Sequence, residues 1–245
     1  MDKIWFSFLS SPLKNNNQNF YDAKSFPWVD KIEDNWEVIK NEIASYVSHN
    51  KEIKPYFNEK LTVDATKWKS FALLVWGWKK NKNIKQCLKT YELLNNIEGL
   101  VSASISILDP ETIIKPHFGD TNAIMRCHLG LIIPGQLPYC GIEVGGIQKS
   151  WEEGKLIIFD DSQTHSAWNN TKQTRIVMII DVVRKEFLDK KYFICSTILS
   201  KLLLQSVLNK FPVFKKLPKK IILNNVLKVN AFIIRIVLRI RSVHF

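Results

Sequence analysis

Apolar and polar residues follow two different rhythms along the chain, and the change comes near Gly99. Before it, apolar residues recur at helical spacing between residues 36 and 47, with Asp34 placed to cap the start of that helix. A second helical run covers 84–94, and the aromatic run 71–78 has the composition of a buried strand. We therefore expect helices and one strand in this part of the chain.

From Leu100 onward the pattern changes to short β-type runs separated by turn residues. The predicted strands are 101–108, 124–133, 142–149, 155–159 and 174–183. Short strands without intervening helices favour an antiparallel sandwich or jelly roll over a parallel sheet with crossover helices. The predicted fold class is therefore mainly β, with the N-terminal helices buttressing one face of the sandwich.

Charge is distributed unevenly. The 245 residues include 35 Lys and Arg and 23 Asp and Glu, for a net charge of +12. Twelve of the basic residues and none of the acidic ones lie in residues 190–245, so the rest of the chain is balanced and general nucleic-acid binding is disfavoured. Four cysteines without paired spacing predict reduced thiols in a cytosolic compartment.

Residues 190–245 form a basic tail in which apolar residues alternate with Lys and Arg, and Leu203, Val207 and Phe211 share helical spacing. No uncharged apolar stretch reaches the roughly 18 residues needed to span a bilayer. Helices that are apolar, basic and free of acids are typical of an anionic membrane surface. This predicts a cytoplasmic protein with peripheral contact to the inner face of the membrane. A helical hairpin packed on the domain and an RNA-binding tail are the alternatives.

Two histidines lie where β-type runs end. His117 follows the turn-prone pair Lys115–Pro116, and His165 follows the run 155–159 and an acidic turn. Histidines in such places suit a metal at the open mouth of a jelly roll, where a facial Fe(II) site uses two His and a carboxylate. The carboxylate is expected two residues after the first His, and Gly119 stands there. Loop histidines in a cupin-like or lectin-like binding sandwich are the alternative.

Basic and hydroxyl side chains gather on neighbouring strands. Arg126 and His128 lie two apart, so both project to the same face of a strand. Arg175 begins the last strand, and a buried arginine needs an anion because an unpaired buried charge costs several kcal/mol. Ser106 adds a hydroxyl. The set suits a small dicarboxylate beside a metal, with arginine supplying bidentate contacts; a structural ion pair is the alternative for Arg175.

Several segments, in order and at compatible gaps, resemble the aspartyl/asparaginyl β-hydroxylase family. They are 116–122 (PHFGDTN), 126–131 (RCHLGL), 151–155 (WEEGK), 159–162 (FDDS) with His165, and Arg175 on a strand that ends at Asp181-Val182. The resemblance covers residues 23–186. It divides the chain into an N-terminal arm (1–22), an oxygenase jelly-roll domain (23–186) and a basic, apolar helical tail (187–245). It implies a double-stranded β-helix that uses Fe(II), 2-oxoglutarate and O2.

The resemblance also implies roles for the residues near the metal. His117 and His165 match the two metal ligands. Hydroxylases of this type have glycine where a third ligand would stand, and Gly119 agrees with that pattern. Asp161 would orient a metal-bound water in place of the absent ligand.

By the same resemblance, Ser106 and Arg175 would hold the distal carboxylate of 2-oxoglutarate. Arg126 and His128 would hold the carboxylate beside the keto group. The chain departs from the family at one place: members acting on aspartate have a basic residue two positions before the equivalent of Arg126, and this chain has Ile124. Ile124 does not affect the oxygenase chemistry that the resemblance implies. It argues against an amino-acid substrate, because the basic residue that binds the acidic side chain is absent.

Three functions therefore compete. The first is hydroxylation of an Asp or Asn side chain in a peptide or protein. The second is the same chemistry on an acyl chain of a membrane lipid or on a small molecule, and the third is an inactive jelly-roll binding module. The retained partners for a cosubstrate's charges argue against the third. The basic tail and Ile124 favour the second, whereas Gly119 and the motif match favour the first, which we rank first by a narrow margin.

Overall fold

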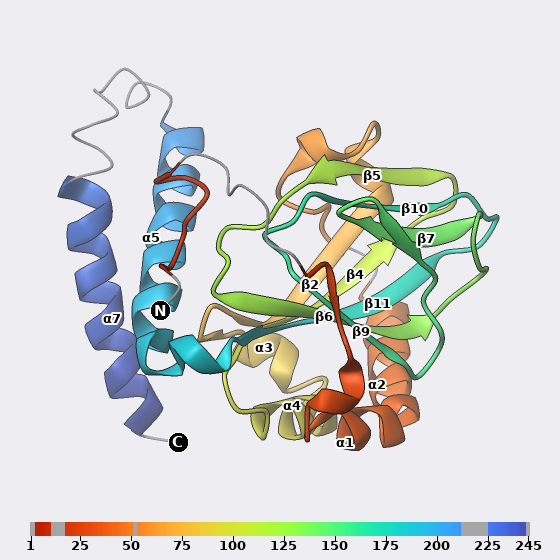
Figure 1. Ribbon diagram of the computed structural model, residues 1–245, viewed down its shortest axis with the longest axis horizontal. Coiled ribbons are helices and arrows are strands. Elements are labelled where there is room, and N and C mark those ends of the chain that lie inside the picture. Colours follow the sequence, from red (N-terminus) through yellow and green to blue (C-terminus); the bar gives the residue numbers. More distant parts are fainter. Residues whose placement is uncertain (1–2, 11–17, 51–52, 212–224, 244–245) are drawn as a thin grey trace.

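Two antiparallel β-sheets face each other in the computed structural model, which describes residues 3–10, 18–50, 53–211 and 225–243. The larger sheet has the order β1-β9-β6-β11-β4-β2-β3 and the smaller one β5-β10-β7-β8 (Figure 1). The strands are β1 (Phe20–Tyr21), β2 (Trp68–Val75), β3 (Trp78–Lys79), β4 (Leu100–Leu108), β5 (Thr112–His117), β6 (Ile124–Ile132), β7 (Cys140–Val144), β8 (Ile147–Lys149), β9 (Leu156–Phe159), β10 (His165–Asn169) and β11 (Arg175–Val183). The mainly β jelly-roll class predicted from the sequence is confirmed.

Helices precede and follow the strands. They are α1 (Val29–Asp34), α2 (Trp36–His49), α3 (Asn81–Ile84), α4 (Leu88–Asn95), α5 (Lys191–Lys210) and α7 (Leu227–Val243), with short 3₁₀ turns at Ala23–Ser25, Glu59–Leu61, Ala65–Lys67 and Lys185–Lys190. Several details of the sequence prediction were wrong. The predicted strand 142–149 is a hairpin of two strands, β7 and β8. Asp34 ends α1 instead of capping α2. The run 84–94 is two helices, because the Glu42 carboxylate on α2 accepts a hydrogen bond from the backbone N–H of Thr90 at 2.7 Å and so caps the start of α4.

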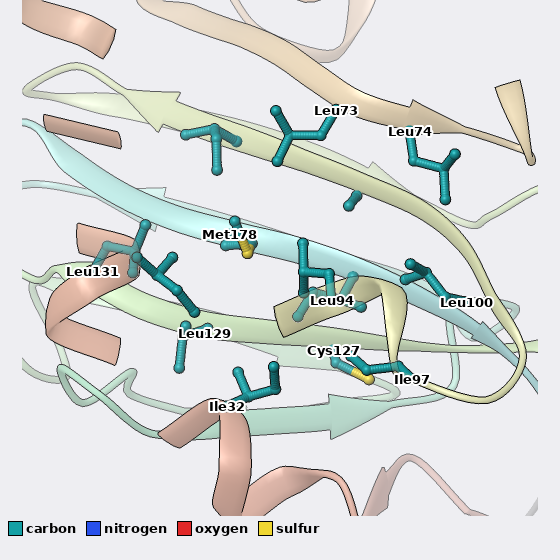
Figure 2. Packing of buried hydrophobic residues seen from close by; sticks show 14 of the residues in the cluster. Ile32, Leu73, Leu74, Leu94, Ile97, Leu100, Cys127, Leu129, Leu131 and Met178 are labelled. Carbon is teal, nitrogen blue, oxygen red and sulfur yellow. The ribbon is translucent and has the colours of Figure 1, made fainter. Parts of the chain in front are cut away.

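Alternate side chains of β4, β6 and β11 enter two different interiors. One set packs against α1, α2 and α4, as Figure 2 shows for Cys127, Leu129 and Met178 with Ile32 and Leu94. The other set points between the two sheets, where the apolar residues include Leu108 and Val177. Both faces of these strands are buried, so a polar residue on either face is an exception that needs a partner.

The C-terminal helices form a hairpin at one end of the barrel, with α5 between α7 and the sheets (Figure 1). Ile194 and Ile198 of α5 pack in a cluster with Ile124 at the start of β6, and Leu238 of α7 joins them. The Lys201 ammonium on α5 also lies 2.6 Å from the Asp120 carboxylate. Packing on the domain, one of the three alternatives for the tail, is therefore what the described part of residues 190–245 shows. Residues 212–224 and 244–245 lie outside the described residues.

One stretch within the described residues, Lys185–Lys210, is long and apolar enough by length and composition to cross a membrane. It is not an uncharged span, because it carries Lys191 and Lys201. Ile194, Cys195 and Ile198 on one of its faces are fully buried against the barrel. A buried core helix satisfies the same test of length and composition.

Candidate active site

A cavity of about 90 Å³ lies between the two sheets, and most of the residues singled out from the sequence line it. Six of the seven predicted site residues lie on its wall: Ser106, His117, Arg126, His128, His165 and Arg175. The seventh, Asp161, contacts two of these six residues through its carboxylate. The structure therefore brings together the set that the sequence predicted to converge.

The two candidate metal ligands are cross-strand neighbours. His117 ends β5 and His165 begins β10, and the register pairs them directly, with their ring centroids 4.3 Å apart. The Nδ1 atom of each ring lies 2.8–2.9 Å from a backbone carbonyl, that of Lys115 and that of Gln163. These contacts assign the ring proton to Nδ1 and leave the Nε2 lone pair of each ring for a ligand. Burial lowers the pKa of both imidazoles, which favours the neutral, ligating form.

Position 119 requires glycine because the Asp161 carboxylate occupies the space that a side chain would need. The backbone N–H of Gly119 donates to the carbonyl of Asp161 at 2.7 Å, and a Cβ at position 119 would overlap the Asp161 carboxylate. A third ligand on this residue has no room. The Asp161 carboxylate itself lies 3.6 Å from Nε2 of His165. Burial raises its pKa to about 7, although Arg126 opposes the shift.

This donor set fits a metal held by two histidines. Metal-bound imidazoles commonly donate their outer N–H to a carbonyl, and both rings do so here. Within the described ranges there is no group of three or more His, Cys, Asp or Glu side chains arranged to hold a metal ion. The fit therefore depends on the pair His117 and His165, with the remaining coordination positions open to small molecules.

Two buried donors that face the cavity have no partner among the described residues. The Arg175 side chain on β11 is 1% exposed, and its Nε has no hydrogen-bond partner in the described part of the chain. Its guanidinium lies 4.8 Å from the centre of the Trp151 ring, and burial lowers its pKa to about 10, so it stays charged at neutral pH. The Trp151 indole N–H donates to Nδ1 of His128 at 3.3 Å, which assigns the ring proton to Nε2; that nitrogen is buried and likewise unpartnered among the described residues.

Ser106 supplies a third group on the same wall. It lies on β4 opposite Val177 of β11, two residues from Arg175. The Trp68 indole N–H donates to the Ser106 hydroxyl oxygen at 3.0 Å, so the hydroxyl hydrogen is left to donate elsewhere. A guanidinium, an imidazole N–H and a hydroxyl around one small cavity fit an anion with carboxylate groups.

Arg126 differs from Arg175 because its partners are already present. Its guanidinium donates to Asp181 through Nε at 2.8 Å and through Nη2 at 3.0 Å, and Nη1 forms an ion pair with Asp161. Burial lowers the pKa of Arg126, but the two carboxylates outweigh it and hold the pKa above its ordinary value. The assignment of Arg126 to a cosubstrate carboxylate stays a prediction, and the geometry adds a role in holding Asp161 and Asp181.

Three residues of the site received no role from the sequence, namely Trp68, Trp151 and Asp181, although Trp151 and Asp181 lie in segments that carry the family resemblance. Asp181, the partner of Arg126, could have been found from the charges on two neighbouring strands. Arg126 on β6 lies directly opposite Asp181 on β11, and opposite charges attract in such a cross-strand pair. Trp151 begins one of the segments that carry the resemblance, but its contact with His128 had no signal. Trp68 had none either, since each tryptophan lies on a different element from the residue that it orients.

Ile124, the position at which the chain departs from the aspartate-acting members, is fully buried at the α5 end of β6. It packs in the cluster that contains Ile194 and Ile198 of α5. An apolar residue is required there because the C-terminal hairpin covers it.

Comparison with known proteins places most of the chain in one group. Residues 33–185 match the family described as aspartyl/asparaginyl beta-hydroxylase. The ornithine lipid ester-linked acyl 2-hydroxylase of Rhizobium tropici is 37% identical over 176 residues, which cover 70% of this chain and 62% of that protein. The aspartyl/asparaginyl beta-hydroxylase of Homo sapiens is 33% identical over 163 residues, covering 64% of this chain and 21% of that protein.

The chain thus spans less than two thirds of the length of these relatives. Among solved structures, a Pseudomonas putida prolyl-4-hydroxylase aligns with 64% of this chain and 99% of its own, at 12% identity and a TM-score of 0.41.

Proposed function

The chain belongs to the aspartyl/asparaginyl β-hydroxylase family, and from that premise we propose that it is an Fe(II)- and 2-oxoglutarate-dependent hydroxylase. The observation that carries the proposal is the Arg175 guanidinium, which is buried in the same small cavity as the two histidines and whose Nε has no hydrogen-bond partner among the described residues. A buried cation without an acidic partner is costly unless an anion binds to it. A ligand that meets both Arg175 and a metal must carry a carboxylate at one end and metal-binding oxygens at the other, as 2-oxoglutarate does.

Each residue of the cavity then has a task. His117 and His165 would hold Fe(II) through Nε2. Arg175 and Ser106 would bind the distal carboxylate, and His128 would donate its Nε2–H to an oxygen of the cosubstrate. When bound, iron and 2-oxoglutarate supply the activation of O2 that inserts one oxygen atom into a C–H bond of the substrate.

Asp161 and Arg126 would act by positioning. The Asp161 carboxylate lies 3.6 Å from Nε2 of His165, and it would accept a hydrogen bond from a water on a metal held there. Arg126 fixes that carboxylate through its own ion pair and ties it to Asp181 on β11. This pairing orients Asp161 and favours its charged form, against the burial that raises its pKa to about 7.

The test is an assay of purified protein for succinate formed from 2-oxoglutarate. We expect succinate only when Fe(II), 2-oxoglutarate and O2 are all present, and an iron chelator should stop the reaction. A protein that neither consumes 2-oxoglutarate nor binds it in the presence of metal would refute the proposal and favour the inactive binding module.

The substrate has two candidates. An Asp or Asn side chain in a peptide or protein is supported by the family description and by the relative from Homo sapiens that carries the same name. A lipid acyl chain is favoured by a specific observation: Ile124, which replaces the basic residue of aspartate-acting members, is sealed beneath α5 and cannot meet a substrate carboxylate. The 37% identical relative named for an acyl 2-hydroxylase supports the same candidate.

A competition between the two classes decides the substrate. An Asp- and Asn-containing peptide and an ornithine lipid in mixed micelles would be supplied together, and each would be examined for the mass of one added oxygen atom. Oxygen in the peptide alone supports side-chain hydroxylation. Oxygen in the lipid alone supports the acyl candidate and a peripheral location at the inner face of the membrane.

A further inference from the structure

The outermost helix of the protein exposes a continuous apolar stripe. Five large side chains of α7 are between 45% and 61% exposed: Val229, Phe232, Ile233, Ile236 and Ile240. With 3.6 residues per turn they share one side of the helix. Single exposed apolar residues are ordinary on a protein surface, but five in register along one helix are not.

The opposite side of α7 already has its partner. Leu227, Ala231 and Leu238 are buried at 3–5% exposure, and Leu238 packs in the cluster shared with α5 and the barrel. The exposed stripe is therefore a second apolar face and not the edge of the packed one. Because α5 lies between α7 and the sheets (Figure 1), the side of α7 opposite its buried residues faces away from the barrel.

Basic side chains flank the stripe, and acidic ones are absent from this part of the sequence. Lys228, Arg235 and Arg239 lie along one flank of α7 and Arg241 along the other. The guanidiniums of Arg235, Arg239 and Arg241 lie over the rings of Phe193, Tyr192 and Trp78 at 4.9, 5.9 and 4.3 Å. Residues 190–245 contain no Asp or Glu, so every charged side chain in this part of the sequence is basic.

We propose that the outer stripe of α7 is a membrane-docking face that inserts into the interface of an anionic bilayer. An apolar face between basic flanks matches the acyl and headgroup layers of such a surface. A second copy of the chain fits less well, because it would bring two hairpins of like charge together. The proposal is independent of the catalytic roles above, since docking requires no turnover.

Docking through α7 would also hold the candidate active site near the bilayer. Asp120, three residues after His117, forms an ion pair with Lys201 on α5, and α5 packs against α7. An ion pair therefore connects the hairpin of α5 and α7 to the segment that follows His117, a candidate metal ligand. A soluble peptide substrate has no need of this arrangement, whereas a substrate in the bilayer does.

The test uses the full chain and two matched pairs of substitutions. Val229→Ser/Ile233→Ser removes two side chains of the stripe that are 58% and 54% exposed. Val63→Ser/Ile147→Ser removes the same residue types elsewhere, at 93% and 51% exposure. Binding is measured by co-sedimentation with vesicles of equal parts phosphatidylglycerol and phosphatidylcholine, and with phosphatidylcholine alone, at low and high salt. Thermal unfolding of each variant confirms that it is folded.

We expect the native chain and the control pair to bind the anionic vesicles at low salt and to be released by high salt. The Val229→Ser/Ile233→Ser variant should bind more than about tenfold more weakly, because each side chain loses its burial in the interface. The proposal is overturned if the native chain does not bind anionic vesicles. It is also overturned if the Val229→Ser/Ile233→Ser and Val63→Ser/Ile147→Ser variants bind them equally well. A native dimer that the stripe variant converts to a monomer, with no vesicle binding, would show that a second copy covers the face. His117→Ala should bind vesicles like the native chain, so a failed hydroxylase assay leaves this result unaffected.

Discussion

Both faces of the central strands β4, β6 and β11 are largely buried, yet the side chains on the two faces have different roles. On β4, β6 and β11 the side toward the helices holds residues such as Ile105, Leu129 and Met178, packed without a polar group among them. At alternating positions of the same strands, the side toward the smaller sheet holds Ser106, His128 and Arg175. Burial alone therefore does not mark the site. On these three strands the mark is a buried polar side chain, such as Arg175 or His128, with a nitrogen for which the described chain offers no partner.

Because of this contrast, we expect substitutions on the two faces to impair different properties of the protein. A helix-side change should lower the free energy of unfolding and leave the chemistry of the surviving folded protein intact. A cavity-side change should alter binding or turnover and leave the fold in place. Each prediction below tests one side of that contrast.

The largest expected effect is on turnover, from His165→Ala. Removing one of two imidazole ligands should abolish 2-oxoglutarate-dependent succinate formation, because the metal would keep a single protein ligand. Thermal unfolding should be little changed. His49→Ala is the matched control, since His49 is an exposed histidine at the end of α2. Full turnover by a His117→Ala/His165→Ala double variant would show that these rings hold no metal.

On the opposite face, Leu129→Ala should lower the free energy of unfolding by about 2–5 kcal/mol, because it leaves a cavity in a core where Leu129 is fully buried. Chemical denaturation measures that loss. At temperatures where the variant is folded, its KM for 2-oxoglutarate should equal that of the native chain. A raised KM would mean that the two faces are mechanically coupled and that the contrast between them is wrong.

A smaller effect is expected at Gly119→Ala. The added Cβ would overlap the Asp161 carboxylate and displace it, at an overpacking cost of about 1–3 kcal/mol. Because Arg175 and Ser106 are untouched, kcat should fall while the KM for 2-oxoglutarate stays the same. Unchanged kcat and unchanged stability together would contradict the placement of Asp161 against Gly119.

The smallest effect is expected at Trp68→Phe, which keeps an aromatic ring but removes the N–H that orients the Ser106 hydroxyl. The loss of one neutral hydrogen bond is worth about 0.5–1.5 kcal/mol. That predicts a KM for 2-oxoglutarate raised about two- to tenfold. Trp168→Phe is the control, because its indole N–H bonds the carbonyl of Pro138 outside the cavity. Equal KM values for both variants would exclude Ser106 from cosubstrate binding.

The strands and the convergence of the site could be predicted because both depend on local patterns. Two-residue periodicity places Arg126 with His128, and strand ends bring His117 and His165 together. The end of β5 could not be predicted in the same way. Pro116 was expected to lie in a turn, but β5 is the edge strand of its sheet, where a missing backbone N–H is tolerated.

Long-range partners were beyond the sequence. The acids that hold Arg126 come from β11 and from the segment before β10, and the group that caps α4 comes from α2. Nothing in the local pattern around Gly119 shows that Asp161 fills its space, although the two are 42 positions apart and in backbone contact. Such contacts depend on how helices and strands pack against one another. No short stretch of the sequence contains that information by itself.

The central claim is that the unpaired donors of the cavity form a 2-oxoglutarate site, and calorimetric titration of 2-oxoglutarate tests it most directly. The protein would be loaded with Mn(II) in place of Fe(II), and the native chain compared with Arg175→Ala. Truncating a buried charge partner costs about 2–5 kcal/mol of binding, so we predict metal-dependent binding that the substitution weakens by more than tenfold. Stability should not fall, because the substitution removes a buried cation that has no acidic partner in the described chain. Equal affinity for the native chain and Arg175→Ala, or no binding by the metal-loaded native chain, would contradict the claim.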